Sequence, residues 1–180
     1  MSSFETALAF TLKSEGGYVD NPADSGGATN QGITQHTYDG YRDSLKLPRR
    51  SVLEIEAAEV HDIYLEMYWA PAHCDGLSSA LACAHFDWAV NHGVTGAIKT
   101  MQQACEVTPD GVWGVHTQAA VSALDTGGLW KAYNWIRLTW YDSRVQSDPS
   151  QAVFLAGWKA RVAALDSLCE QLSENEPQDP

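Results

Sequence analysis

The chain has 180 residues, 44% of them hydrophobic, which is enough for one compact domain or a domain with a fused helical lobe. Its net charge of −12 excludes a nucleic-acid-binding surface, because no excess of cations could neutralise phosphates, and it disfavours simple attraction to an anionic cell wall. No apolar run has the length of a membrane span, and residues 1–10 lack the basic start and long apolar stretch of a signal peptide. We therefore expect synthesis in the cytoplasm.

The first predicted helix covers residues 2–15. Ser2 and Glu5 have the spacing of a capping box, and an apolar stripe along this helix ends on Glu15. A carboxyl group at the end of an apolar stripe is partly desolvated, which favours its protonated form near neutral pH. Gly16 and Gly17 then stop the helix and keep bulk away from the acid.

A polar, glycine-rich run follows the acid and carries Asp20, Asp24, Thr29 and Thr34. One protonatable acid facing a loop with carboxylates and hydroxyls is the arrangement of groups that is typical of glycoside hydrolysis. The alternative is a solvated surface glutamate beside an ordinary loop. Thr34 also stands where the next helix needs an N-cap, so capping and a role in the site are both open.

The remaining apolar periodicity predicts a mostly α protein. Expected helices cover residues 34–45, 51–67, 78–90, 93–105, 115–124, 130–145 and 151–172. No long strand is evident, although a short β-hairpin near residues 17–32 is compatible with the pattern. The acidic, apolar-free residues 173–180 are expected to be a disordered tail.

Two aromatic segments admit either core packing or a sugar-binding groove. Tyr68 and Trp69 close the predicted 51–67 helix, and core packing is the commoner fate of such a pair. Asp87 lies between aromatic residues on a largely buried helix, so it needs a cation or a backbone donor. We interpret Asp87 and Asn91 as structural or groove-shaping hydrogen-bonding residues, with catalysis as the weaker alternative for Asp87.

The sequence predicts neither a metal nor a cofactor. The four cysteines have no C-x-x-C spacing, and His85 and His92 have no third ligand at a suitable position. The cysteines are expected to be buried thiols. A disulfide between Cys74 and Cys83 is an alternative if the protein works outside the cell.

Three blocks carry a family resemblance. EGGY followed by NPADSGGATNQGIT (15–34), FDWAVNHG (86–93) and DGVWG (110–114) resemble the N-acetylmuramidases of glycoside hydrolase family 108, found in phage endolysins and in bacterial proteins once called secretion activators. The glutamate of EGGY is the catalytic acid of that family, and it corresponds to Glu15. Ser25 stands where the family commonly has proline, which implies a less rigid turn. Residues 97–121 also resemble helical peptidoglycan-binding repeats.

The resemblance implies a two-lobed, lysozyme-like helical fold. We expect a catalytic lobe over residues 1–95 and a peptidoglycan-binding-like lobe over 96–172 packed against it. The implied reaction is hydrolysis of the β-1,4 bond between N-acetylmuramic acid and N-acetylglucosamine, with Glu15 as general acid. Asp24 is the first candidate for the second group and Asp20 the reserve; Thr29 or Thr34 would position water or sugar.

The partner implied is bacterial peptidoglycan, attacked at the periplasmic wall by a monomer that would need a holin pore if it is a phage protein. The expected substrate contacts are Tyr18, Asp20, Thr29, Asn30, Gln31, Asp87 and Asn91. A non-catalytic wall-binding protein, or a lytic transglycosylase or chitinase on a similar frame, remains an alternative. Inverting and retaining mechanisms are both open.

Overall fold

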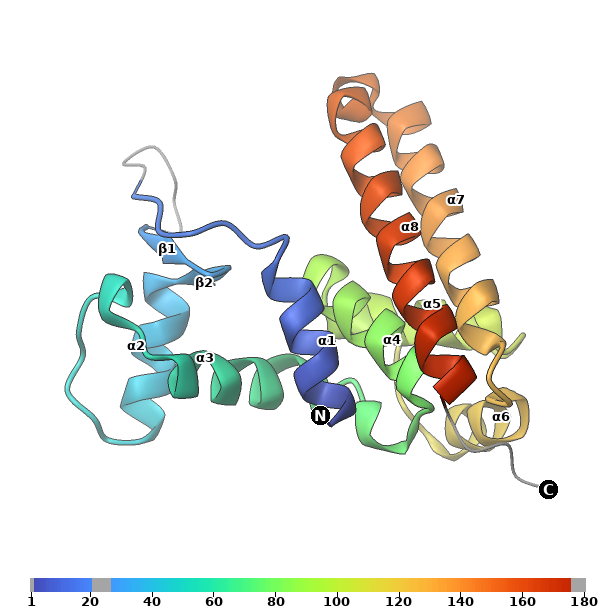
Figure 1. Ribbon diagram of the computed structural model, residues 1–180, viewed down its shortest axis with the longest axis horizontal. Coiled ribbons are helices and arrows are strands. Elements are labelled where there is room, and N and C mark those ends of the chain that lie inside the picture. The colour runs from blue at the N-terminus through green and yellow to red at the C-terminus, as the bar shows by residue number, and fades with distance from the viewer. Residues whose placement is uncertain (1, 21–26, 176–180) are drawn as a thin grey trace. The chain divides into compact units, whose positions relative to one another are not determined.

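The computed structural model describes residues 2–20 and 27–175 and confirms the mostly α, lysozyme-like class (Figure 1). Contacts divide the chain into two compact units. We call residues 8–67 the hairpin unit, and residues 1–7 together with 68–180 the helical unit. Within the described ranges, no helix combines the length and the apolar character needed to cross a membrane.

Helix α1 (Ser3–Leu12) begins with the predicted capping box. The Ser2 backbone N–H donates to Glu5 Oε2 at 2.9 Å, and the Glu5 N–H donates to Ser2 Oγ at 3.2 Å. The helix ends earlier than predicted, because the N–H groups of Lys13 and Ser14 bond three residues back and tighten its last turn. Glu15 therefore lies three residues beyond the helix rather than on it.

The predicted β-hairpin exists but lies further along the chain than residues 17–32. Strand β1 (Thr29–Asn30) pairs antiparallel with β2 (Ile33–Thr34), and an isolated bridge adds Val19 beside Thr29. The two turn residues, Gln31 and Gly32, have φ of 51° and 77°. Two successive positive φ values are typical of a type I′ turn, whose twist matches that of the paired strands.

Helix α2 (Gln35–Ser44) follows with Thr34 as its N-cap, but the predicted single helix over 51–67 is wrong. That segment forms a 3₁₀ turn, an α-helix and a π-helical turn: η1 (Val52–Glu54), α3 (Ala57–Tyr64) and η2 (Leu65–Trp69). The Asn30 amide donates to the carbonyls of Val52 at 3.1 Å and Leu53 at 3.5 Å, which a continuous helix would need for its own bonds. A tertiary contact thus overrides local propensity.

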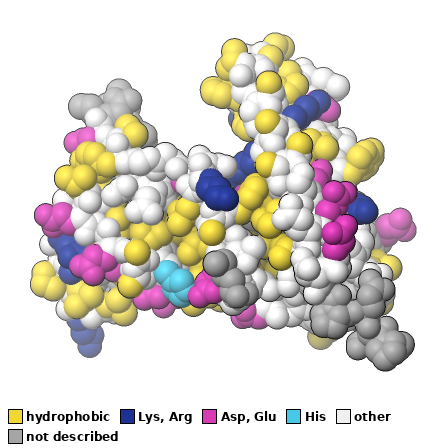
Figure 2. Space-filling model, in the orientation of Figure 1, with side chains coloured by type: hydrophobic (Ala, Val, Ile, Leu, Met, Phe, Trp, Pro, Cys, Tyr) yellow, Lys and Arg dark blue, Asp and Glu magenta, His cyan; other side chains and the backbone are white. Residues whose placement is uncertain are grey.

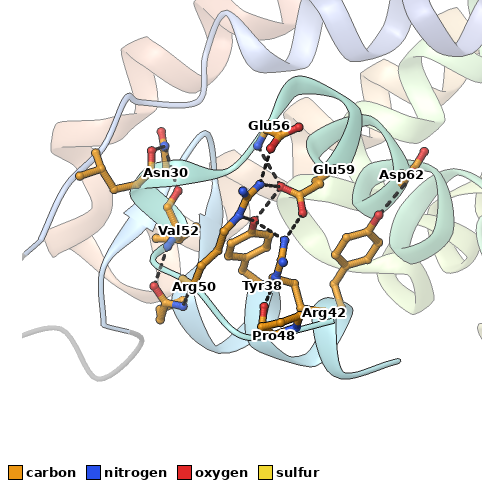
Figure 3. Close-up of polar contacts among 12 residues, drawn as sticks. Asn30, Tyr38, Arg42, Pro48, Arg50, Val52, Glu56, Glu59 and Asp62 are labelled. Atoms are coloured by element: carbon orange, nitrogen blue, oxygen red, sulfur yellow. Dashed lines mark hydrogen bonds and ion pairs between the residues drawn. The ribbon is translucent and has the colours of Figure 1, made fainter. Parts of the chain in front are cut away.

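A charged network ties α2 to α3 inside the hairpin unit (Figure 3). Glu59 accepts from Arg42 at 2.5 Å, from Arg50 at 2.6 Å and from the Tyr38 hydroxyl at 2.6 Å. Burial alone would raise the pKa of Glu59, but the bonds from Tyr38, the Glu56 backbone N–H and Arg50 outweigh it and lower this pKa to about 2. The ionised carboxylate is therefore built into the fold of this unit.

The helical unit centres on α4 (Ser79–His92), which packs against three other helices (Figure 1). The unit also contains α5 (Val94–Ala104), α6 (Val115–Leu124), α7 (Leu129–Ser147), α8 (Ala152–Asn175) and the short turns η3 (Cys74–Gly76) and η4 (Pro149–Gln151). Helices α7 and α8 lie side by side. Residues 173–175, expected in the disordered tail, belong to α8, and residues 176–180 lie outside the described residues.

The four cysteines are buried free thiols, as predicted, and the Cys74–Cys83 bridge is not formed. Trp69 is only 2% exposed and contacts the rings of Phe4 and Phe86, so core packing is correct for this residue.

Glu59→Gln should lower the free energy of unfolding by about 2–4 kcal/mol at pH 7, because it leaves two arginines facing a neutral group. Since the folded pKa lies below the ordinary value of 4.5, this stabilisation is complete above pH 4.5 and is lost as the pH falls towards 2. Urea unfolding of both proteins from pH 7 to pH 2 checks this. Glu54→Gln, at an exposed site of the same unit, is the control. A difference that stays constant across this range would contradict the assignment.

Candidate functional site

The hairpin turn brings two functional side chains to one glycine. A Cβ atom on Gly32 would lie 2.9 Å from Glu15 Oε2 and 2.6 Å from the Tyr64 hydroxyl oxygen, both within the hairpin unit. Together with its φ of 77°, this contact leaves room for glycine alone. The carboxylate of Glu15 and the phenol of Tyr64 therefore converge on the bare face of the turn.

Tyr64 is the residue that sequence reasoning missed as part of the site. It is the last residue of α3 and is 1% exposed, and its position in the sequence indicates only the apolar face of a helix. Its hydroxyl donates to the carbonyl oxygen of Gln31 at 2.8 Å. A buried tyrosine needs a hydrogen-bond partner for its hydroxyl, and that requirement was the available signal.

Gln31 adopts φ of 51°, which non-glycine residues seldom do. Its backbone carbonyl is held by Tyr64, so the surrounding structure maintains an otherwise unfavourable conformation. Such residues cluster at ligand-binding sites. Glu15 is half-buried at this site.

The segment before β1 contains three more of the predicted site residues. Tyr18 and Asp20 are exposed on either side of the Val19–Thr29 bridge, and the Tyr18 hydroxyl lies 3.5 Å from Asp20 Oδ2. The bridge places this segment beside β1, within the unit that holds Glu15. Asp24, the predicted second group, lies outside the described residues.

Asn30 and Thr34 have structural roles in this fold. The Asn30 amide binds the carbonyls of Val52 and Leu53 in η1, where the predicted helix is interrupted. Thr34 accepts from the Thr37 backbone N–H at 3.2 Å and so caps α2, which was one of its two predicted roles.

Asp87 is a core ion pair and not a groove residue. It is fully buried in the helical unit, where it accepts from Arg137 at 2.8 Å and from Arg161 at 2.7 Å. Burial would raise the pKa of Asp87, but these two arginines lower it below its usual range. Of the two kinds of partner predicted for Asp87, a cation or a backbone donor, the cation is present, and both carboxylate oxygens are already occupied. Asn91 is exposed and donates to the Asp87 carbonyl at 2.6 Å.

In the parts of the chain that the structure describes, no three His, Cys, Asp or Glu side chains are grouped so that they could hold a metal ion. His85 is buried between the Tyr133 hydroxyl and the Ala72 carbonyl, at 2.9 and 3.0 Å. Burial lowers the pKa of His85 to about 4, so it is a neutral core residue.

Comparison with known proteins assigns the chain to a family. Residues 8–93 match the family described as "Glycosyl hydrolase 108", and residues 96–163 match a "Predicted Peptidoglycan domain". No curated protein matches the chain. The solved structure of Brucella abortus SagA is similar to 97% of this chain and 97% of its own, with 31% sequence identity and a TM-score of 0.78. The family indicated by the EGGY, FDWAVNHG and DGVWG blocks is confirmed. The glutamate, the glycine turn and the tyrosine of the site lie inside the matched region, residues 8–93. The chain belongs to the glycosyl hydrolase 108 family of glycosidases.

Proposed function

We propose that this protein is a peptidoglycan N-acetylmuramidase with Glu15 as its general acid. The observation that carries the proposal is the position of the Glu15 carboxylate against Gly32, beside the Tyr64 hydroxyl. The match of residues 96–163 to a peptidoglycan domain supports peptidoglycan as the substrate.

The proposed reaction breaks the bond between C1 of N-acetylmuramic acid and the glycosidic oxygen. Protonated Glu15 donates its proton to that oxygen, which leaves as the 4-hydroxyl of N-acetylglucosamine. Positive charge develops on the muramic acid ring, and water attacks C1 to give a new reducing end. A second group takes the proton that this water loses, which leaves both sugars neutral at the reacting atoms. Proton exchange with solvent then returns Glu15 to its protonated form and the second group to its unprotonated form.

Tyr64 acts in this proposal as a positioning residue. By donating to the Gln31 carbonyl it holds the turn in the conformation that leaves Gly32 facing Glu15. The carboxylate then has a fixed wall on one side, which limits the orientations it can adopt towards a glycan.

Asp24 is the proposed second group, with Asp20 as the reserve. Asp20 is exposed on the segment that bridges to Thr29, which supports a place for this segment along the bound glycan. Tyr18, Thr29 and Gln31 are proposed substrate contacts for the same reason. The separation between the second carboxylate and Glu15 would distinguish an inverting from a retaining reaction.

We also propose that residues 1–95 carry catalysis, and that residues 96–172 contribute peptidoglycan binding. The biological role that fits this activity is that of an endolysin, made in the host cytoplasm and released through a holin pore to act as a monomer on the periplasmic wall. The resemblance of the EGGY block to phage endolysins supports this role.

Glu15→Gln should reduce the rate of wall hydrolysis about 10²- to 10⁴-fold, because amide cannot donate the proton. Turbidity loss of purified peptidoglycan, with mass analysis of the released fragments, measures this. Wild type should leave reducing N-acetylmuramic acid ends. Glu66→Gln, at an exposed site of the same unit, should retain full activity. Anhydro-muramic ends would instead indicate a lytic transglycosylase, and binding without cleavage a wall-binding protein.

Gly32→Ala should cost about 1–3 kcal/mol of stability and also reduce activity, because the methyl group would collide with Glu15 and Tyr64. Gly40→Ala is the matched control. Gly40 lies inside α2 with nothing within 4 Å of an added Cβ, so this change should be neutral or slightly stabilising. Thermal unfolding and turbidity assays compare the two variants. Equal stability and equal activity of the two variants would show that the absence of a side chain at Gly32 does not position Glu15.

A further inference from the structure

A pocket of about 390 Å³ opens in the helical unit where the end of α4 meets the second half of α7 and the start of α8. It is independent of the hairpin turn, because all of its lining residues belong to the helical unit. Figure 2 shows hydrophobic side chains gathered on the free end of the α7–α8 pair, with basic side chains on the same two helices. Val153 and Phe154, 78% and 54% exposed, contribute to that end.

The pocket has an aromatic wall whose rings are held by one another. The rings of Trp88 and His92 are stacked with centroids 4.5 Å apart, and Trp140 meets His92 edge to face at 4.3 Å. Tyr141 and Trp158 are stacked at 4.8 Å. Trp140 and Trp158 are half-buried and therefore keep part of their surface open. Flat, partly exposed aromatic faces of this kind suit the apolar face of a pyranose ring.

The pocket also carries a cation, whose charge acts on the Asp148 carboxylate without an ion pair between the two side chains. Arg144 is exposed, lies 5.6 Å from the Trp140 ring centroid, and forms no ion pair with any residue in 2–20 or 27–175. Burial, then Arg144 and Arg137, lower the pKa of His92, so Arg144 is the charged group of the pocket at neutral pH. In a chain of net charge −12, an unpaired arginine beside a pocket is suited to an anionic ligand group.

We propose that this pocket binds the muropeptide unit of peptidoglycan, with an N-acetylated sugar on the aromatic wall and a carboxylate of the peptide stem on Arg144. The side-chain amides of Asn91 and Gln151 line the same pocket and can bond to the acetamido group or hydroxyls. The choice of ligand rests on the proposed function, and most of the lining residues fall within the range that matches a peptidoglycan domain. The pocket thus selects glycan that carries an acidic stem over neutral glycan.

The test uses the full chain with Glu15→Gln, so that ligand is bound without turnover. Two probes are titrated by calorimetry: a disaccharide carrying its peptide stem, and an N-acetylglucosamine hexamer, which has no carboxylate. Arg144→Gln should weaken muropeptide binding about 10-fold or more, the size of one charge-assisted hydrogen bond, and leave hexamer binding unchanged. Trp140→Ala should weaken both. In the Glu15→Gln protein, the indole N–H signals of Trp140 and Trp158 should shift on titration with the muropeptide.

Lys131→Gln and Trp135→Ala are the matched controls. Both residues are exposed on α7 and line a separate depression, so neither change should affect binding. The proposal is overturned if Arg144→Gln binds the muropeptide as tightly as its parent does, or if Arg144→Gln weakens binding of the hexamer as much as binding of the muropeptide. Loss of the proposed muramidase activity is a separate result, because an inactive protein that binds muropeptide through Arg144 would still support this pocket.

Discussion

The candidate active site depends on the absence of a side chain at one position. Gly32 has positive φ, and a Cβ there would overlap the space held by the Glu15 carboxylate and the Tyr64 hydroxyl. The same steric condition forms the type I′ turn, which fixes the register of β1 with β2. One constraint thus links the local hairpin to the placement of an acid that lies seventeen residues earlier in the chain.

Each unit is organised around a carboxylate with two arginines. Glu59 binds Arg42 and Arg50 in the hairpin unit, and Asp87 binds Arg137 and Arg161 in the helical unit. Such pairs contribute little net stability compared with a well-packed apolar core, but removing one partner is costly. They therefore fix which helices pack together. Glu59 and Asp87 thus have structural roles in arginine pairs, whereas Glu15 lies beside the Tyr64 hydroxyl and Gly32.

Local signals in the sequence predicted much of the fold. The capping box at Ser2 formed as expected, and α6 has the predicted bounds, because both depend on neighbouring residues. Errors arose where distant side chains intervene: the Asn30 amide interrupts the helix near residue 55, and periodicity alone could not foresee it. The apolar stripe and the family resemblance both indicated Glu15, whereas the partnership with Tyr64 required the three-dimensional turn.

The most direct test of this account is a crystal structure of the Glu15→Gln protein with a bound peptidoglycan oligosaccharide. We predict one glycosidic oxygen within about 2.6–3.2 Å of the residue 15 side chain, beside the Gly32 turn. We also predict an N-acetylmuramic acid ring on the C1 side of that oxygen. A glycan bound with every glycosidic oxygen beyond the reach of residue 15, and with another carboxylic acid at the bond, would contradict the central claim.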